Sequence, residues 1–294
     1  MRTFFHISLM GILICLTSLH VQAKQTSNSP SAKTVLIAAG DIAQCATSGA
    51  MQTAALIQKE PGTVLALGDL AYPYGRREDF TQCYEPNWGK FKARTLPTPG
   101  NHEYKTEDAA GYFEYFGKRA GRNKTGYYST NIGKWHIVSL NSNIDSGPDS
   151  VQAKWLQNDL TNNRSTCILA FWHHPRFSSG KHGDNAYMSA LWEILFDYHA
   201  SIVLSGHDHT YERFAPLNKD GQRDDKHGIR SFVVGTGGAK HYEFDDINTN
   251  SEVRHANSWG VLKLTLEPDS YSWQYLPVGD SQFHDSGTGR CVTP

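Results

Sequence analysis

Polar residues repeatedly follow short apolar runs in this chain, usually after a glycine. Four of the runs are typical of buried strands: Val35–Ala39, Val64–Leu67, Ile168–Trp172 and Ile202–Leu204. Because the carboxyl ends of strands in one open sheet meet at a single crevice, we expect the polar residues to gather there. The five motifs, in chain order, are Gly40-Asp41, Gly68-Asp69-Leu70-Ala71-Tyr72, Gly100-Asn101-His102-Glu103, Trp172-His173-His174-Pro175 and Gly206-His207-Asp208-His209.

The pattern of strands and helices changes along the chain. Thr34–Ala39, Gly49–Lys59 and Thr63–Leu67 predict a strand, a helix and a strand, which implies parallel strands with a right-handed crossover. After the last motif the pattern favours strands, including Val261–Leu266 and Tyr271–Tyr275. We therefore expect an α/β fold in one domain, with two packed mixed β-sheets flanked by helices.

Three segments between the motifs carry further expectations. Tyr74–Arg94 is polar and aromatic without a clean period, so we expect it to form a loop over the site. Thr95–Thr98 contains a proline and precedes another, which favours a strand near a sheet edge or a strand end. Val151–Leu160 is amphipathic and predicts a helix with Asp149 or Ser150 at its N-cap.

The first 23 residues have the pattern of a secretory signal peptide. Arg2 gives a short positive region, Ile7–Leu19 is largely apolar, and Val21-Gln22-Ala23 fits a small-residue cleavage site. The apolar run is short for a membrane span. We expect residues 1–23 to be removed, residues 24–33 to form a flexible leader, and the protein to be exported, either secreted or periplasmic.

The charge of the chain argues against nucleic-acid binding, and its cysteines predict disulfides. The formal net charge is −1 and no Lys/Arg block stands out, which argues against a surface that binds a nucleic-acid duplex. Four cysteines follow the leader, and an even number in an exported protein predicts disulfides. Cys45 and Cys83 each follow a polar motif at the same sheet edge and are the favoured pair. Cys167–Cys291 follows only by elimination, and a buried thiol at Cys167 is an equal alternative.

Together the five motifs resemble those of the calcineurin-like metallophosphoesterases. Tyr72 and the string Gly206–Arg213 make the chain similar to a purple acid phosphatase in a short single-domain form. The resemblance runs from about Val35 to about Tyr275 and implies that residues 34–294 are a metallophosphoesterase catalytic domain. One departure is Asp41-Ile42-Ala43, where the family usually has Asp-x-Gly, and this leaves the path of the first loop open.

The resemblance also implies a pair of metal ions with a shared ligand. Phenols have an ordinary pKa near ~10, so a tyrosinate ligand favours a strong Lewis acid such as Fe(III). Two imidazoles and an amide suit a divalent neighbour, Zn, Mn or Fe. The alternatives are helix-capping aspartates and a packed loop tyrosine. By resemblance the first ion would be held by Asp41, Asp69, Tyr72 and His209, and the second by Asp69, Asn101, His173 and His207.

Several nearby residues are candidates for roles beyond metal binding. By resemblance, His102 faces the substrate and donates a proton, and His182 corresponds to a second substrate-side histidine, with an exposed loop histidine as the alternative. The family pattern His-x-Pro leaves His174 as a spacer, and Lys181 is a weaker phosphate contact. Glu212 and Arg213 are expected to brace the loop after the last motif.

The resulting hypothesis is an acid phosphatase-like hydrolase that cleaves phosphate monoesters by attack of a metal-activated hydroxide. Its expected partner is a small phosphorylated substrate. A phosphodiesterase acting on nucleotides or lipid headgroups is the alternative, because specificity lies in loops such as Tyr74–Arg94 and Lys240–His255. A non-catalytic secreted binding protein is a third class, and the complete set of candidate ligands argues against it. The oligomeric state stays open.

Overall fold

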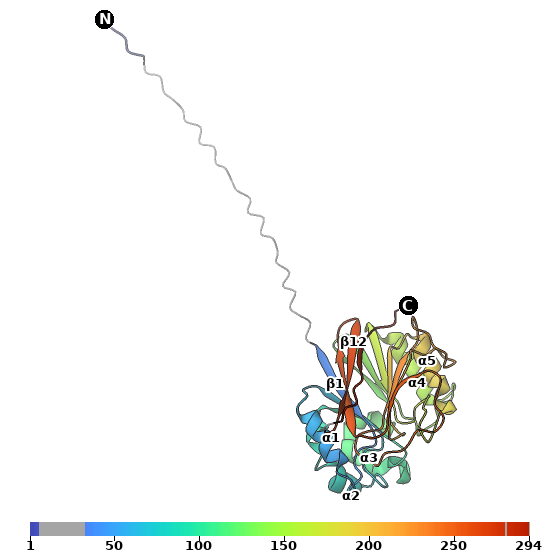
Figure 1. The fold of residues 1–294 in the computed structure, drawn as a ribbon. Coiled ribbons are helices and arrows are strands. Elements are labelled where there is room, and N and C mark those ends of the chain that lie inside the picture. Colours follow the sequence, from blue (N-terminus) through green and yellow to red (C-terminus); the bar gives the residue numbers. More distant parts are fainter. Residues whose placement is uncertain (6–32, 280, 294) are drawn as a thin grey trace. The chain divides into compact units, whose positions relative to one another are not determined.

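The computed structural model describes residues 1–5, 33–279 and 281–293. Apart from residues 1–5 and 33, the expected signal peptide and leader lie outside the described residues. All strands and helices belong to the unit that runs from Ala32 to Pro294. They form two mixed sheets flanked by helices, as the sequence predicts (Figure 1).

The first sheet has six strands in the order β13-β12-β11-β1-β2-β3. The strands β1, β2 and β3 run parallel, and the helix α1 (Gly49–Gln58) provides the expected crossover between the first two. β3 lies at the sheet edge, where Pro97 can be accommodated because a proline has no N–H to donate. The strand bounds are β1 Thr34–Ala39, β2 Thr63–Leu67, β3 Thr95–Thr98, β11 Gly260–Leu266, β12 Ser270–Pro277 and β13 Ser286–Arg290.

The second sheet has seven strands in the order β10-β8-β9-β7-β6-β5-β4, with β5, β6, β7 and β9 parallel. The helices α4 (Val151–Asn162) and α5 (Ser189–Asp197) cover its outer face (Figure 1). Ser150 is the N-cap of α4, because its Oγ accepts the N–H of Ala153 at 3.1 Å. The strand bounds are β4 Tyr128–Ile132, β5 Trp135–Ser139, β6 Cys167–Phe171, β7 Ile202–Ser205, β8 Tyr211–Phe214, β9 Arg230–Val234 and β10 Ser251–His255.

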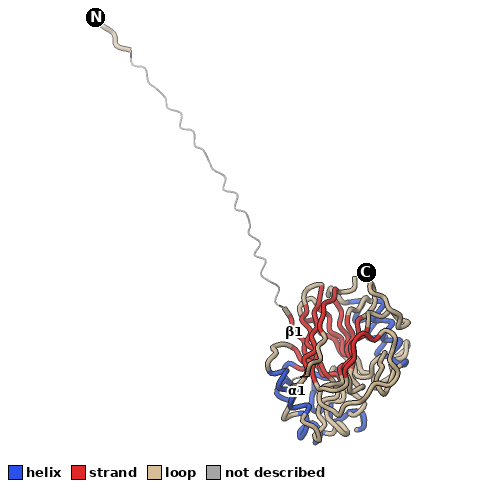
Figure 2. Tube along the Cα trace, in the orientation of Figure 1, coloured by secondary structure: helices blue, strands red, loops and turns tan. Residues whose placement is uncertain are grey.

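The main hydrophobic core lies between the two sheets, which run side by side in Figure 2. Successive side chains of β6 point to opposite faces of the second sheet and pack into two different hydrophobic cores. Leu169 and Phe171 belong to the main core, whereas Ala170 belongs to the core under α4 and α5. Burial of this apolar surface on both faces holds the strand ends, and therefore the polar motifs, in fixed positions.

The expected loop over Tyr74–Arg94 is wrong. This segment contains α2 (Arg77–Asp79) and two further helical turns, η1 (Phe80–Tyr84) and η2 (Gly89–Arg94). Its buried aromatics lie three or four residues apart, which is the spacing of helical turns. The polar residues between them hid this helical period in the sequence. These aromatics are Phe80, Tyr84, Trp88 and Phe91. The remaining helices are η3 Glu103–Lys105, η4 Glu107–Ala109, α3 Ala110–Phe116, η5 Gly117–Ala120, η6 Arg122–Lys124 and η7 Ala186–Met188.

Two disulfides tie the ends of these elements together. Cys45 and Cys83, 5.1 Å apart between Cα atoms, join the loop after β1 to η1, which confirms the favoured pair. Cys167 and Cys291, 5.4 Å apart, join β6 to the segment after β13, so the alternative of a free thiol is wrong. Within the described residues, none of the helices has both the length and the apolar character that crossing a membrane requires.

Candidate dinuclear metal centre

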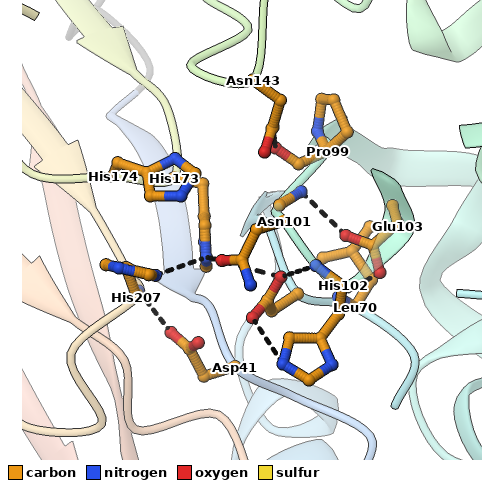
Figure 3. Close-up of polar contacts among 12 residues, drawn as sticks. Asp41, Leu70, Pro99, Asn101, His102, Glu103, Asn143, His173, His174 and His207 are labelled. Carbon is orange, nitrogen blue, oxygen red and sulfur yellow. Dashed lines mark hydrogen bonds and ion pairs between the residues drawn. The ribbon is translucent and has the colours of Figure 1, made fainter. Parts of the chain in front are cut away.

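The five polar motifs meet at one end of the two sheets, as the strand pattern predicts. Each motif follows the carboxyl end of a parallel strand: β1, β2 and β3 in the first sheet, and β6 and β7 in the second. Figure 3 shows the polar ends of Asn101, His173 and His207 turned toward one another, although they come from three different loops. The fold therefore assembles the candidate ligands of both sheets around one crevice.

Four donor atoms form a compact first set, which we call donor set one: Asp41 Oδ1, Asp69 Oδ2, the Tyr72 hydroxyl and His209 Nε2. The Tyr72 oxygen lies 3.0 Å from Asp41 Oδ1, 3.2 Å from Asp69 Oδ2 and 3.1 Å from His209 Nε2. His209 Nε2 lies 3.3 Å from Asp41 Oδ1. Separations of this size are those between neighbouring ligands of one cation whose bonds are about 2.0–2.2 Å long.

A second set, donor set two, lies directly beside the first. His173 Nε2 is 3.4 Å from Asp69 Oδ1, 3.1 Å from Asn101 Oδ1 and 3.2 Å from His207 Nδ1. Asp69 therefore gives one carboxylate oxygen to each set. This is the arrangement that a carboxylate bridging two metal ions requires.

Hydrogen bonds behind two histidines fix which ring nitrogen faces the donor sets. The Nδ1–H of His173 donates to the Leu67 carbonyl at 2.9 Å, and that of His209 donates to the Lys240 carbonyl at 2.6 Å. In each neutral ring the Nε2 lone pair then faces the donor set. Backbone carbonyls commonly orient metal-bound histidines in this way, so the donor atoms present fit a metal centre.

The charges of the site also favour cations. Burial alone would raise the pKa of Asp69, but the nearby His173 and His102 hold it below its usual range. Burial lowers the pKa of His173, yet the carboxylates of Asp69 and Asp41 raise it to about 9. Burial, followed by the same carboxylates, raises the pKa of Tyr72 well above its ordinary value. A phenolate at this position therefore needs a strong positive charge beside it.

The backbone at the ligands is strained. Asp41, Asp69 and His207 have φ values of 58°, 51° and 74°, in the left-handed region that costs a non-glycine residue about 1–3 kcal/mol. Gly100 allows the motifs to approach closely, because a Cβ there would lie 2.2 Å from Asp69 Oδ1. Ala43 is not among the residues with positive φ, and its N–H donates to the Leu70 carbonyl at 3.1 Å. Alanine therefore suits the first loop.

The two candidate catalytic histidines contact different residues of the donor sets. The Nδ1–H of His102 donates to the Pro73 carbonyl at 2.7 Å, so its Nε2, 3.8 Å from Asp69 Oδ2, faces the site. Nδ1 of His182 lies 2.9 Å from Asp208 Oδ1, and its ring lies 4.3 Å from that of His207. The structure thus brings both rings beside the donor sets, and His182 lies in an exposed turn with its ring bonded to Asp208.

Three buried or half-buried residues support the site but were not assigned a role from the sequence. Glu103 accepts the N–H groups of Leu70, Ala71 and Gly100, which fixes two ligand loops together. Asp208 accepts hydrogen bonds from Ser178 and His182, and the ring of Tyr242 stacks on His209 at 4.0 Å. Glu103 and Asp208 stand inside the motifs, whereas no sequence signal singles out Tyr242.

The remaining candidates take secondary positions. His174 Nδ1 lies 2.8 Å from the Ser142 hydroxyl, and its ring nitrogens also lie close enough to His173 and His207 for the three to share a metal ion, so its role as a spacer stays a prediction. Lys181 is exposed, with its Nζ 5.3 Å from the centre of the Tyr242 ring. Glu212 accepts from the backbone and side chain of Ser179, and Arg213 bonds to Asp285. Both brace their loops, as expected.

Comparison with known proteins identifies the family. A family model described as calcineurin-like phosphoesterase matches residues 27–211. The chain is 31% identical to purple acid phosphatase 15 of Arabidopsis thaliana over 195 residues, covering 54% of this chain and 37% of that protein. It is 30% identical to purple acid phosphatase 21 of the same plant over 225 residues, covering 68% and 49%. The chain thus spans about half or less of the length of these relatives.

A solved structure agrees at the level of the fold. The purple acid phosphatase PPD1 from yellow lupin (Lupinus luteus) seeds superposes with a TM-score of 0.74 at 22% identity, covering 88% of this chain and 54% of that one. Its fold has the same two sheets and flanking helices. The chain belongs to the calcineurin-like phosphoesterase family and, within it, resembles the purple acid phosphatases.

Proposed function

We propose that this protein is a dinuclear-metal phosphatase that hydrolyses phosphate monoesters. One observation carries the proposal: the two oxygens of the buried Asp69 belong to two different donor sets. Asp41, Tyr72 and His209 complete donor set one, and Asn101, His173 and His207 complete donor set two. A pair of bound cations supplies Lewis acidity for the phosphoryl group and a water of lowered pKa.

The chain's own residues would place and protonate the substrate. His102 presents Nε2 beside donor set one, with Lys105 Nζ 3.1 Å away, because its Nδ1 is occupied by Pro73. Donation of a proton from Nε2 to the departing ester oxygen is its proposed role. The Nδ1 of His182 is occupied by Asp208 and its ring lies against His207. We assign His182 to hydrogen bonding with a phosphoryl oxygen.

The proposed metals are Fe(III) in donor set one and Zn, Mn or Fe as a divalent ion in donor set two. The argument rests on Tyr72, whose phenol requires a strong Lewis acid to ionise in this buried site. We expect the iron-loaded protein to absorb visible light through a tyrosinate-to-iron transition. Tyr72→Phe should remove this absorption in an absorbance spectrum, while a colourless iron-loaded wild type would rule out the Fe(III)–phenolate assignment.

Elemental analysis combined with two assays tests the function. The purified protein should contain two metal ions per chain and hydrolyse p-nitrophenyl phosphate with a higher kcat/KM than bis-p-nitrophenyl phosphate. A higher kcat/KM for the diester would instead establish a phosphodiesterase on the same scaffold. Protein that binds no metal and cleaves neither ester would be a binding protein, and the proposal would be wrong.

We further propose that residues 34–294 are the catalytic domain of an exported protein, secreted or periplasmic. The two disulfides support export, because such bonds persist in oxidising compartments. Mass spectrometry of protein recovered outside the cytoplasm should give a chain that begins at Lys24. Recovery of a chain that keeps residues 1–23 and stays in the cytoplasm would contradict this assignment.

A further inference from the structure

A cavity of about 570 Å³ opens beside donor set one. Its inner wall consists of Tyr72 and His209 of donor set one and of the candidate catalytic residue His102. Its outer wall includes the Cys45–Cys83 disulfide, which joins the loop after β1 to η1. The cavity is therefore continuous with the place where a phosphoryl group would bind. We call it the leaving-group pocket.

Three polar groups on the wall of this pocket have no partner among the described residues. They are the amide of Gln82, the ammonium of Lys240 and the hydroxyl of Tyr242. The Gln44 amide oxygen accepts the Lys240 N–H at 3.0 Å, which leaves the Gln44 NH₂ group to donate. Such groups favour a ligand that offers hydrogen-bonding atoms on several sides.

Among the described residues of the wall, Asp79 is the one carboxylate and Lys240 the one ammonium, so the two charges balance and the pocket does not repel an anionic substrate. Asp79 Oδ2 accepts the N–H groups of Tyr74 and Arg76 at 3.2 and 3.0 Å. Pro73 and the Tyr242 ring, which stacks on His209 at an angle of 11°, supply flat apolar surface.

A second cavity beside His182 is less suitable. It measures about 530 Å³ and shares only His182 with the proposed site. Three carboxylates, from Asp184, Asp245 and Asp246, and one ammonium, from Lys181, line it. The excess of negative charge there opposes the entry of a phosphate ester, whereas at the leaving-group pocket Lys240 balances Asp79. The organic part of the substrate is therefore expected beside Tyr72 rather than beside Asp245.

We propose that the leaving-group pocket receives the organic part of a nucleoside 5′-monophosphate. This inference rests on the proposed phosphatase function and names its substrate class. A purine or pyrimidine ring has flat faces for Tyr242 and hydrogen-bonding edges for Gln82 and Gln44, and the volume is that of a small-molecule site. Water adds its oxygen to phosphorus, the ester P–O bond breaks, and the departing 5′ oxygen takes a proton, which gives nucleoside and inorganic phosphate.

The test compares kcat/KM for adenosine 5′-monophosphate with kcat/KM for glycerol 2-phosphate, and the ratio of the two is the selectivity. Ala46→Trp fills the pocket from an exposed position, so its fold should be preserved. We expect it to lower the selectivity at least about ten-fold, the scale of contacts made in a specificity pocket. Gln82→Ala should lower the selectivity by a few-fold, because it removes one hydrogen-bonding group.

Matched controls outside the pocket, and one variant in the second cavity, show which site binds the organic part of the substrate. Ala93→Trp and Gln157→Ala make the same changes at exposed positions outside the pocket and should leave the selectivity unchanged. Equal selectivity in wild type, Ala46→Trp and Gln82→Ala would overturn the pocket assignment while the phosphatase function stands. Ile247→Trp fills the second cavity instead. If the selectivity falls in this variant alone, the ring binds in the second cavity, and the assignment to the leaving-group pocket is overturned. A wild type that hydrolyses neither ester would overturn the proposed function itself.

Discussion

Asp69→Asn is expected to lower kcat/KM for a phosphate monoester by about 10³-fold or more, the scale seen when a main electrostatic stabiliser is removed. Asp69 is buried, and its two oxygens lie in separate donor sets. The amide has nearly the same shape and keeps one oxygen, but it carries no charge and its nitrogen repels a cation. Metal content should fall well below two ions per chain in the same preparation, as measured by elemental analysis.

Asp197→Ala is the control for this experiment. Asp197 is exposed at the end of α5 and has no ion pair within the described part of the chain. It should keep both metal content and turnover, because it removes a carboxylate that has no role in the site. Two ions per chain and wild-type turnover in Asp69→Asn would contradict the bridging assignment, and with it the dinuclear proposal.

His102→Ala should lower kcat by about 10²–10⁴-fold, the usual contribution of a positioned acid or base. Its metal content should stay at two ions per chain, because His102 belongs to neither donor set. The ring touches the site through Nε2, 3.8 Å from Asp69 Oδ2, while Pro73 occupies Nδ1. Stopped assays together with elemental analysis of one preparation measure both quantities.

Measuring turnover and metal content in the same variant shows whether His102 donates a proton or supports metal binding. A loss of metal in His102→Ala would show that the ring supports the ligands instead, and unchanged turnover would remove the catalytic assignment. His284→Ala provides the matched histidine substitution, because His284 is exposed and has no bond or ion pair within the described residues. It should match the wild type in both measurements.

The meeting of the polar motifs could be predicted because local signals place the strands before them, whereas the assignment of individual ligands came from the family resemblance. Asp41 and Asp69 follow buried strands directly, and parallel strands present their carboxyl ends at one edge. The Cys45–Cys83 disulfide and the edge position of Pro97 also follow from local rules. The ligand roles stay predictions, although the geometry brings their donor atoms together.

Other features depend on contacts that no local pattern specifies. Tyr242 reaches His209 only because the loop after β9 folds back over the site, and its neighbours in sequence have no regular period. The strands β10 and β13 lie at sheet edges with exposed and half-buried residues alternating, so they lack the apolar run of a core strand. Their pairing comes from backbone hydrogen bonds to a neighbour, which sequence composition does not reveal.

Each donor set joins the two sheets. Asp41 and Asp69 follow strands of the first sheet, whereas His173, His207 and His209 follow strands of the second. A cation bound in either set would therefore cross-link the two sheets. Its binding free energy would then add to the free energy of unfolding of the whole domain. Loss of the metals would accordingly lower the stability of the fold as well as the rate of the proposed hydrolysis.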